Sequence, residues 1–402
     1  MVKKKWKQLT VAAGLALCFG LAVKADTQAA SQVTGLKQTG DSSSRIDVQC
    51  DAALGADKYY LELSTDKNEW VTVETSSGTS ISAYSLSSGA SYYARVGLCT
   101  DWDGNDKVAG TVSEPIEVVT APSDNNMEAV QTDAKTTGFS VKSSAVAGAN
   151  YYQLYYDKTK LGESASSTVT SKVKLNAGQT YWCHLYACRK SASGYLAEGS
   201  NDYVSLKTLA PAVNTRSFGV TAEWLTINSY RFGVSMPYNK DGIQFQFSTP
   251  AGKVKKSVTT TGDSTYVDNF INGNFYKYRV RSYVVCGAKN VYSAWSGYKY
   301  IGVPKKTSFK MSKNRKSLNI SIGKVNDATS YTVYSSTKEK SGFKKVKTVS
   351  AKKRSLSVTK VGGKKLKKNT KYYFRVVPNA KIGGKTIASQ NNVTYVYSYT
   401  YY

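Results

Sequence analysis

The sequence predicts an all-β protein made of four tandem copies of one small β-sandwich. The first observation is a spacing: four times along the 402 residues, a large apolar residue precedes a tyrosine by six positions. The successive tyrosines are 89, 95 and 96 residues apart. A period of this length is that of a whole domain and not of a solenoid repeat. The four pairs are Leu86 and Tyr92, Leu175 and Tyr181, Phe270 and Tyr276, and Leu366 and Tyr372.

The second observation is a period-two pattern of apolar residues, which predicts strands with one buried face. In the first copy it appears at Ile46 and Val48, then after the Gly55–Asp57 turn, and again after Tyr92. We find no convincing helical period, and short strands with Gly, Ser and Asn turns are typical of a sandwich. The upstream strands of the other copies are marked by Phe139 and Val141, by Phe232 and Val234, and by Leu318, Ile320 and Ile322.

These residues resemble the fibronectin type III family, over residues 31–402. The resemblance implies an immunoglobulin-like sandwich in which Tyr92, Tyr181, Tyr276 and Tyr372 form tyrosine corners, with each hydroxyl bonded to main chain near the start of strand F. The family usually buries a tryptophan near the end of strand B, so core volume must be recovered elsewhere here. The matching positions are Cys50, Ser143, Met236 and Ile322. Repeats of this style occur in secreted proteins of Gram-positive bacteria.

Prolines mark the expected domain boundaries, because proline ends a central strand and stiffens a joint. They follow Ala121, Ala210 and Val303. The predicted fibronectin type III-like domains are 31–121, 122–210, 211–304 and 305–402.

The first residues have the features of an export signal. Four lysines precede the apolar stretch Leu9–Val23, and small residues follow at Ala25 and Ala30. We expect a signal peptide over 1–25, with cleavage as late as residue 30 as a variant. A lipoprotein signal on Cys18 is the alternative. No second apolar run is long enough to span a membrane. The expected mature chain is secreted, in solution or associated with a cell wall.

Charge is distributed unevenly over the copies. The net charge is −8 over 26–121, +2 over 122–210, +7 over 211–304 and +22 over 305–402. A concentration of like charge in one domain favours a polyanion-binding module, and a merely solubilising lysine-rich surface is the alternative. The expected partner is an anionic cell-wall polymer or a host glycan or protein, whereas export makes nucleic acid an unexpected partner. The candidate binding residues are Lys344, Lys345, Lys347, Lys352, Lys353, Arg354, Lys364, Lys365, Lys367 and Lys368.

Other candidate sites have weaker patterns. Trp102 is expected on a loop, where it could stack on a sugar ring. The surrounding acids, 101–106, could wrap calcium or form a solubilised hairpin tip. His184 is the single histidine, so no histidine-based metal cluster can form. We find no nucleophile elbow and no supported carboxylate pair, and we expect a non-enzymatic chain without cofactors.

The cysteines do not form a disulfide framework. Five follow the predicted signal, an odd number with irregular spacing. Strand parity directs Cys50 inward and Cys99 outward, and places Cys183 and Cys188 on opposite faces. Buried or inactive thiols are the expectation.

Two functions remain: a binding, adhesion or spacer protein with a basic anchor, or a carbohydrate-binding accessory protein of a polysaccharide-degrading system.

Overall fold

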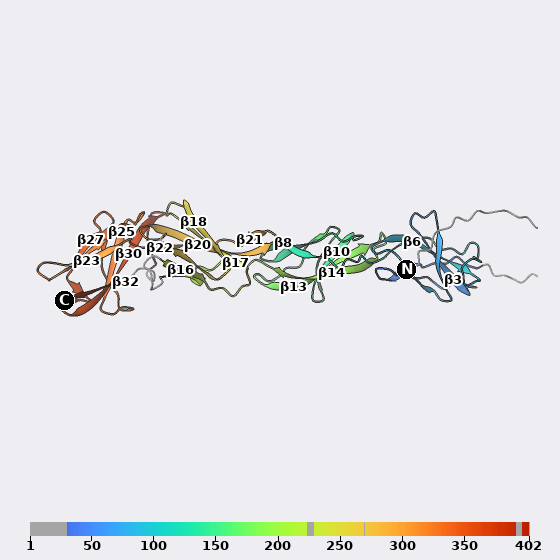
Figure 1. Cartoon of the computed structure of the whole chain (residues 1–402), viewed down its shortest axis with the longest axis horizontal. Coiled ribbons are helices and arrows are strands. Elements are labelled where there is room, and N and C mark those ends of the chain that lie inside the picture. The colour runs from blue at the N-terminus through green and yellow to red at the C-terminus, as the bar shows by residue number, and fades with distance from the viewer. Residues whose placement is uncertain (1–29, 223–228, 269, 391–395, 402) are drawn as a thin grey trace, which may run out of the picture. The chain divides into compact units, whose positions relative to one another are not determined.

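The computed structural model of the chain describes residues 30–222, 229–268, 270–390 and 396–401 (Figure 1). The predicted signal peptide, 1–25, therefore lies outside the described residues. In the described residues, the regular secondary structure is all strand apart from one short 3₁₀ turn, η1 (Thr215–Ser217). This confirms the predicted all-β class.

The first two sandwiches each combine a three-stranded and a four-stranded sheet. The three-stranded sheet of the first has the order β1 (Lys37–Asp41), β2 (Ile46–Gln49), β5 (Ser80–Ala83). Its four-stranded sheet has the order β4 (Val71–Ser76), β3 (Lys58–Ser64), β6 (Ser91–Cys99), β7 (Ile116–Val119). The second sandwich has β12 (Thr168–Thr170), β9 (Gly138–Ser143), β8 (Ala129–Lys135) in one sheet. Its other sheet is β11 (Thr159–Ser164), β10 (Tyr151–Tyr156), β13 (Thr180–Lys190), β14 (Leu196–Lys207).

The last two sandwiches keep this order and add a strand to the larger sheet. The third has β15 (Phe218–Ala222), β16 (Ser229–Val234), β19 (Ser264–Asp268) in one sheet. The other is β18 (Val254–Thr260), β17 (Gly242–Ser248), β20 (Phe275–Cys286), β21 (Lys289–Tyr292), with β22 (Lys299–Gly302) also on β20. The fourth has β23 (Thr307–Met311), β24 (Leu318–Ile322), β27 (Ser355–Val358). Its larger sheet is β26 (Lys344–Ser350), β25 (Ser330–Ser336), β30 (Thr370–Ile382), β31 (Lys385–Ala388), with β32 (Val396–Tyr401) also on β30. A small hairpin joins β28 (Lys360–Val361) to β29 (Lys364–Lys365).

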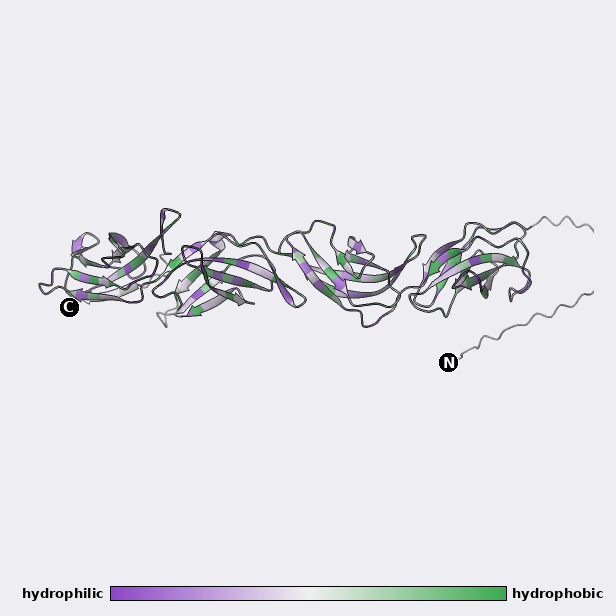
Figure 2. Cartoon of the chain, turned by 90° about the horizontal axis from the view of Figure 1, so that it is seen from above, coloured by the Kyte–Doolittle hydropathy of each residue, from purple (hydrophilic) through white to green (hydrophobic). Residues whose placement is uncertain are grey.

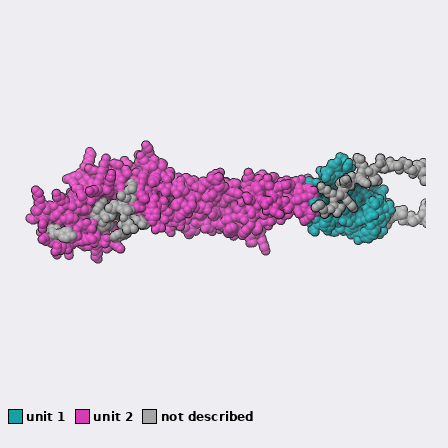
Figure 3. Space-filling model, in the orientation of Figure 1, with its two compact units in different colours: residues 1–41, 45–86, 91–118 teal, residues 42–44, 87–90, 119–402 magenta. Residues whose placement is uncertain are grey.

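Chain contacts divide the molecule into two compact units, coloured separately in Figure 3. One corresponds to most of the first sandwich, and the other contains the remaining three. The prolines at the predicted boundaries lie between β7 and β8, between β14 and η1, and between β22 and β23. The domain limits drawn from them stay predictions.

Each sandwich has a core cluster between its two sheets, to which Phe275 of β20 contributes in the fourth, and hydropathy alternates along the strands (Figure 2). The predicted alternating residues are inside: Ile46 and Val48, for example, are fully buried. In the third sandwich, other aromatic residues occupy the core in place of the missing strand B tryptophan. In the third sandwich Phe232 packs edge-on against Tyr278 with ring centroids 5.1 Å apart, and both rings are fully buried.

Candidate functional site

The fourth sandwich has an open edge where its two sheets adjoin. Strand β26 is the edge of the larger sheet and pairs with β25, while β27 is the edge of the smaller sheet and pairs with β24. Only residues 351–354 connect them, so the chain crosses from one sheet to the other here. A β-bulge in β26 leaves Val346 without a register partner, between Lys345 and Lys347. Such a bulge bends an edge strand away from regular pairing.

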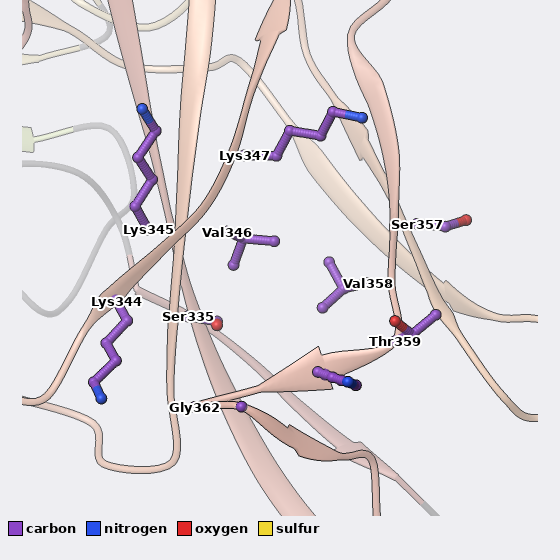
Figure 4. A pocket seen from close by; sticks show the side chains of 11 residues that line it. Ser335, Lys344, Lys345, Val346, Lys347, Ser357, Val358, Thr359 and Gly362 are labelled. Carbon is purple, nitrogen blue, oxygen red and sulfur yellow. The ribbon is translucent and has the colours of Figure 1, made fainter.

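A groove runs along this edge and consists of two hollows with volumes of about 380 and 610 Å³. The hollows share Lys347 and Ser357. Figure 4 shows the first hollow, with Val346 and Val358 in its middle and Lys347 extending toward the strand that carries Ser357. We call this the β26–β27 groove. Its cationic residues, the groove lysines, are Lys344, Lys345, Lys347, Lys353 and Lys360.

The lining of the groove combines positive charge with neutral hydrogen-bonding groups. Hydroxyls of Ser350, Ser355 and Thr359 line it beside the lysines, and it contains no acidic residue. Gly362 and Gly363 form one end in left-handed backbone conformations, with φ of 60° and 85°. Ammonium and hydroxyl donors near the apolar side chains of Val346 and Val358 suit phosphate or sulfate esters of a chain-like ligand.

The groove lysines lack acidic partners. Within the described chain, none of the recorded ion pairs involves them, and the two acids of residues 305–402, Asp327 and Glu339, do not line the groove. The first sandwich differs, because its buried Glu62 is paired with Arg95 at 2.6 Å and also with Lys107. Uncompensated lysines repel one another, and an approaching polyanion relieves that repulsion.

The structure separates the ten predicted residues into two groups. Lys344, Lys345, Lys347 and Lys353 line the groove. The other six lie on the β26–β27 turn, on β29 and on the loop before β30: Lys352, Arg354, Lys364, Lys365, Lys367 and Lys368. Lys360 was missed, because it stands alone in the sequence and its place at the groove depends on the β28–β29 hairpin.

The predicted tyrosine corners lie at the starts of β6, β13, β20 and β30. The Tyr181 hydroxyl accepts the Asn176 amide at 2.9 Å, and the Tyr372 hydroxyl accepts the Lys367 amide at 2.7 Å. Tyr276 is buried and stacks on Phe270 at 4.5 Å, and Tyr92 packs against the first core. The sequence did not predict a second set of tyrosine–main-chain hydrogen bonds. The Tyr59 hydroxyl accepts the Ala53 amide at 3.0 Å, and the Tyr331 hydroxyl accepts the Val325 amide at 2.8 Å.

Trp102 lies on an exposed loop, with 65% of its surface accessible and Lys58 over its ring at 4.3 Å. The acids around it close the loop: the Asp101 carboxylate accepts the amides of Asp106 and Asn105 at 3.0 and 3.1 Å. The Asp106 amide is the main cause of the lowered pKa of Asp101. Among the residues that the structure describes, no group of three or more His, Cys, Asp or Glu is arranged to hold a metal ion.

All five cysteines outside the predicted signal are buried thiols that form no disulfide. The prediction that Cys99 faces outward is wrong, because Cys99 is buried. The loop that returns at Lys107 pairs with it, and its thiol contacts the Asp101 carbonyl at 3.3 Å. Cys183 belongs to the second core, and Cys188 is equally buried outside that cluster. Burial raises the pKa of Cys183 to about 12.

No family model matches the chain, and no curated protein matches it. Solved structures that match include the chicken CNTN1 FN1–FN3 domains, at 12% identity over 93% of this chain and 99% of that one, with a TM-score of 0.19. Another is the sixth fibronectin type III domain of human fibronectin type III domain containing protein 3, at 24% identity over 24% of this chain and 89% of that one, with a TM-score of 0.20.

The strand orders define the class of the protein. Each sandwich pairs a three-stranded sheet with a larger sheet. In all four, the fifth strand along the chain (β5, β12, β19 or β27) belongs to the three-stranded sheet. The chain is a tandem array of four fibronectin type III-like β-sandwiches. In the described segments, no helix has the length and apolar character needed to cross a membrane.

Proposed function

We propose that this chain is a secreted or cell-surface, non-enzymatic binding or spacer protein, held on a polyanionic surface by its fourth sandwich. The observation that carries the proposal is the β26–β27 groove, which collects five lysines without an acidic partner in the domain of highest net charge. The predicted export signal supports a location outside the cell.

The chemistry of the groove indicates the kind of ligand. Lysine is a point charge without the bidentate geometry of arginine, so it favours charge density over a fixed stereochemistry. The expected ligand is a linear polymer with phosphate or sulfate esters, either an anionic cell-wall polymer or a sulfated host glycan. Because the lysines are exposed, binding should weaken with salt and be lost near ~0.5 M.

The test uses the full mature chain and two probes, wall teichoic acid and heparin, each immobilised for binding measurements at low salt. Replacement of four groove lysines in the variant K344Q/K347Q/K353Q/K360Q should weaken binding at least about tenfold, since each contact contributes electrostatic free energy. The probe that binds more tightly distinguishes a wall phosphate polymer from a sulfated glycan.

The matched control removes the same charge from exposed lysines of the same sandwich outside the groove, in K310Q/K313Q/K316Q/K385Q. It should retain binding within about threefold. Equal losses in the two variants would mean that net charge alone attracts the polymer, and the groove would not be the site. Binding to neither probe would refute the polyanion function itself.

A further inference from the structure

The second sandwich carries a row of aromatic rings on the outer face of its larger sheet. Trp182, His184 and Tyr186 alternate along β13, and Tyr203 on β14 pairs with His184. The ring of Trp182 stacks on Tyr203 with centroids 5.6 Å apart and an interplanar angle of 25°. His184 continues the row, 4.6 Å from Tyr203 and 5.9 Å from Tyr186. We call these four residues the aromatic ladder.

The ladder is exposed at one end. Trp182 and Tyr203 have 53% and 56% of their surfaces accessible, although large aromatic residues usually bury their rings. They are adjacent on one flat face, so they form a patch and not two scattered residues. Exposed aromatic patches of this kind are typical of recognition surfaces.

In each of the other three sandwiches, the position of His184 is occupied by an arginine whose guanidinium lies over an aromatic ring. In the first, the Arg95 guanidinium lies over Trp70 at 4.0 Å. In the third, Arg279 lies over Trp295 at 4.3 Å, and in the fourth, Arg375 lies over Phe343 at 4.2 Å. The second sandwich therefore replaces a covering cation by one more ring in the stack.

The polar groups around the ladder are neutral or mutually compensated. The Asn201 side-chain oxygen lies 3.1 Å from Nδ1 of His184, and Ser205 faces Trp182 across the strands. The lysines of the two strands β11 and β14 have acidic partners: Lys160 pairs with Glu163 at 2.6 Å, and Lys207 pairs with Asp241. This surface thus offers ring faces, an amide and hydroxyls, and the lysines of β11 and β14 beside it are paired with acids.

We infer that the aromatic ladder is a binding surface for an uncharged saccharide chain. A pyranose ring presents an apolar C–H face that packs on an aromatic ring, and hydroxyls at its rim that pair with amide and hydroxyl groups. The flat sheet face can contact an extended polysaccharide along its length. The charge contrast with the β26–β27 groove favours a neutral polymer here, and the inference does not depend on the groove's function.

The test is a glycan microarray of neutral and sulfated glycans probed with the full mature chain in 0.5 M NaCl, which suppresses electrostatic binding. Wild type should bind neutral glycans, and W182A and Y203A should each weaken this binding at least about tenfold, as expected for aromatic anchors. Both side chains are exposed, so the substitutions leave the core intact.

The matched controls are W102A and Y84A, which truncate exposed aromatics of the first sandwich and should change binding less than twofold. The inference would be overturned if wild type bound no neutral glycan, or if W102A alone abolished binding. It would also be overturned if the ladder mediated self-association, seen as a concentration-dependent mass increase that W182A removes.

Discussion

The second and fourth sandwiches share their interior and differ in their surfaces. Their central pairs are equivalent: Leu154 faces Leu185 in the second, and Val333 faces Val376 in the fourth. Even the β-bulge falls at the same place, after Leu154 and after Val333. The outward positions carry neutral rings in one sandwich and lysines beside a groove in the other.

This difference shows how strand alternation separates folding from binding. Every second side chain enters the core and must stay apolar, whereas its neighbours face water and can change without loss of the fold. Net charges of +2 and +22 over residues 122–210 and 305–402 are therefore compatible with one topology. We expect changes inside to affect stability in both sandwiches alike, and changes outside to affect binding in only one.

The largest effect should come from truncating the shared interior. Leu185→Ala and Phe374→Ala remove fully buried side chains, and each should lower the free energy of unfolding by about 2–5 kcal/mol. Hydrogen exchange of peptides from β13 and β30 measures the loss in each sandwich separately. Exposed substitutions such as Trp182→Ala serve as controls and should change exchange little. A small effect of either core truncation would contradict the equivalence of the two interiors.

A smaller effect on stability should come from the buried thiol of Cys183 in the core of the second sandwich. Burial raises the pKa of Cys183 to about 12, so the folded chain keeps this proton above pH 9 while the unfolded chain releases it. Stability of the second sandwich should therefore fall as pH rises from about 9. The fourth sandwich contains no cysteine and lacks this contribution.

Hydrogen exchange corrected for its intrinsic pH dependence, compared between pH 8 and pH 10, measures this effect. Cys183→Ala should reduce the pH sensitivity of β13 peptides and leave β30 peptides unchanged. An equal pH dependence in wild type and variant would show that the thiol is not responsible.

Much of the fold could be predicted because it depends on local alternation. The strands containing Ile46, Phe139, Phe232 and Leu318 follow from period two, and the structure confirms them. The environment of Cys99 was not predictable from parity, because a loop ending at Lys107 covers it.

The candidate site was predictable only in part. A lysine-rich segment is visible in sequence, but the groove requires β26 and β27 to be adjacent edges of different sheets, which is a tertiary property. That arrangement places Lys353 on the groove and adds Lys360, while Lys367 and Lys368 stay outside it. The ladder had a sequence signal, since His184 occupies the position held by arginine in the other copies. The sequence did not show that this change leaves rings uncovered, because the rings under the arginines of the other copies are found only in the structure.

The smallest effect should come from restoring that arginine. In His184→Arg the guanidinium should lie over the neighbouring rings, as Arg279 lies 4.3 Å from the ring centroid of Trp295 in the third sandwich. An exposed cation–π contact of this kind contributes about 0.5–1 kcal/mol, so hydrogen exchange in β13 should slow accordingly. Neutral-glycan binding should fall, because the ring faces become covered and acquire a charge. The reverse change, Arg279→His, should remove one of the two guanidinium groups that lie 4.3 Å from the Trp295 ring, since Arg281 also lies over it. It should destabilise the third sandwich by at least a similar amount, because it also removes the hydrogen bonds to Gln246 at 2.8 and 3.1 Å. If His184→Arg left glycan binding unchanged, the missing arginine would not explain the exposed ladder, and the contrast between the copies would lie in the rings alone.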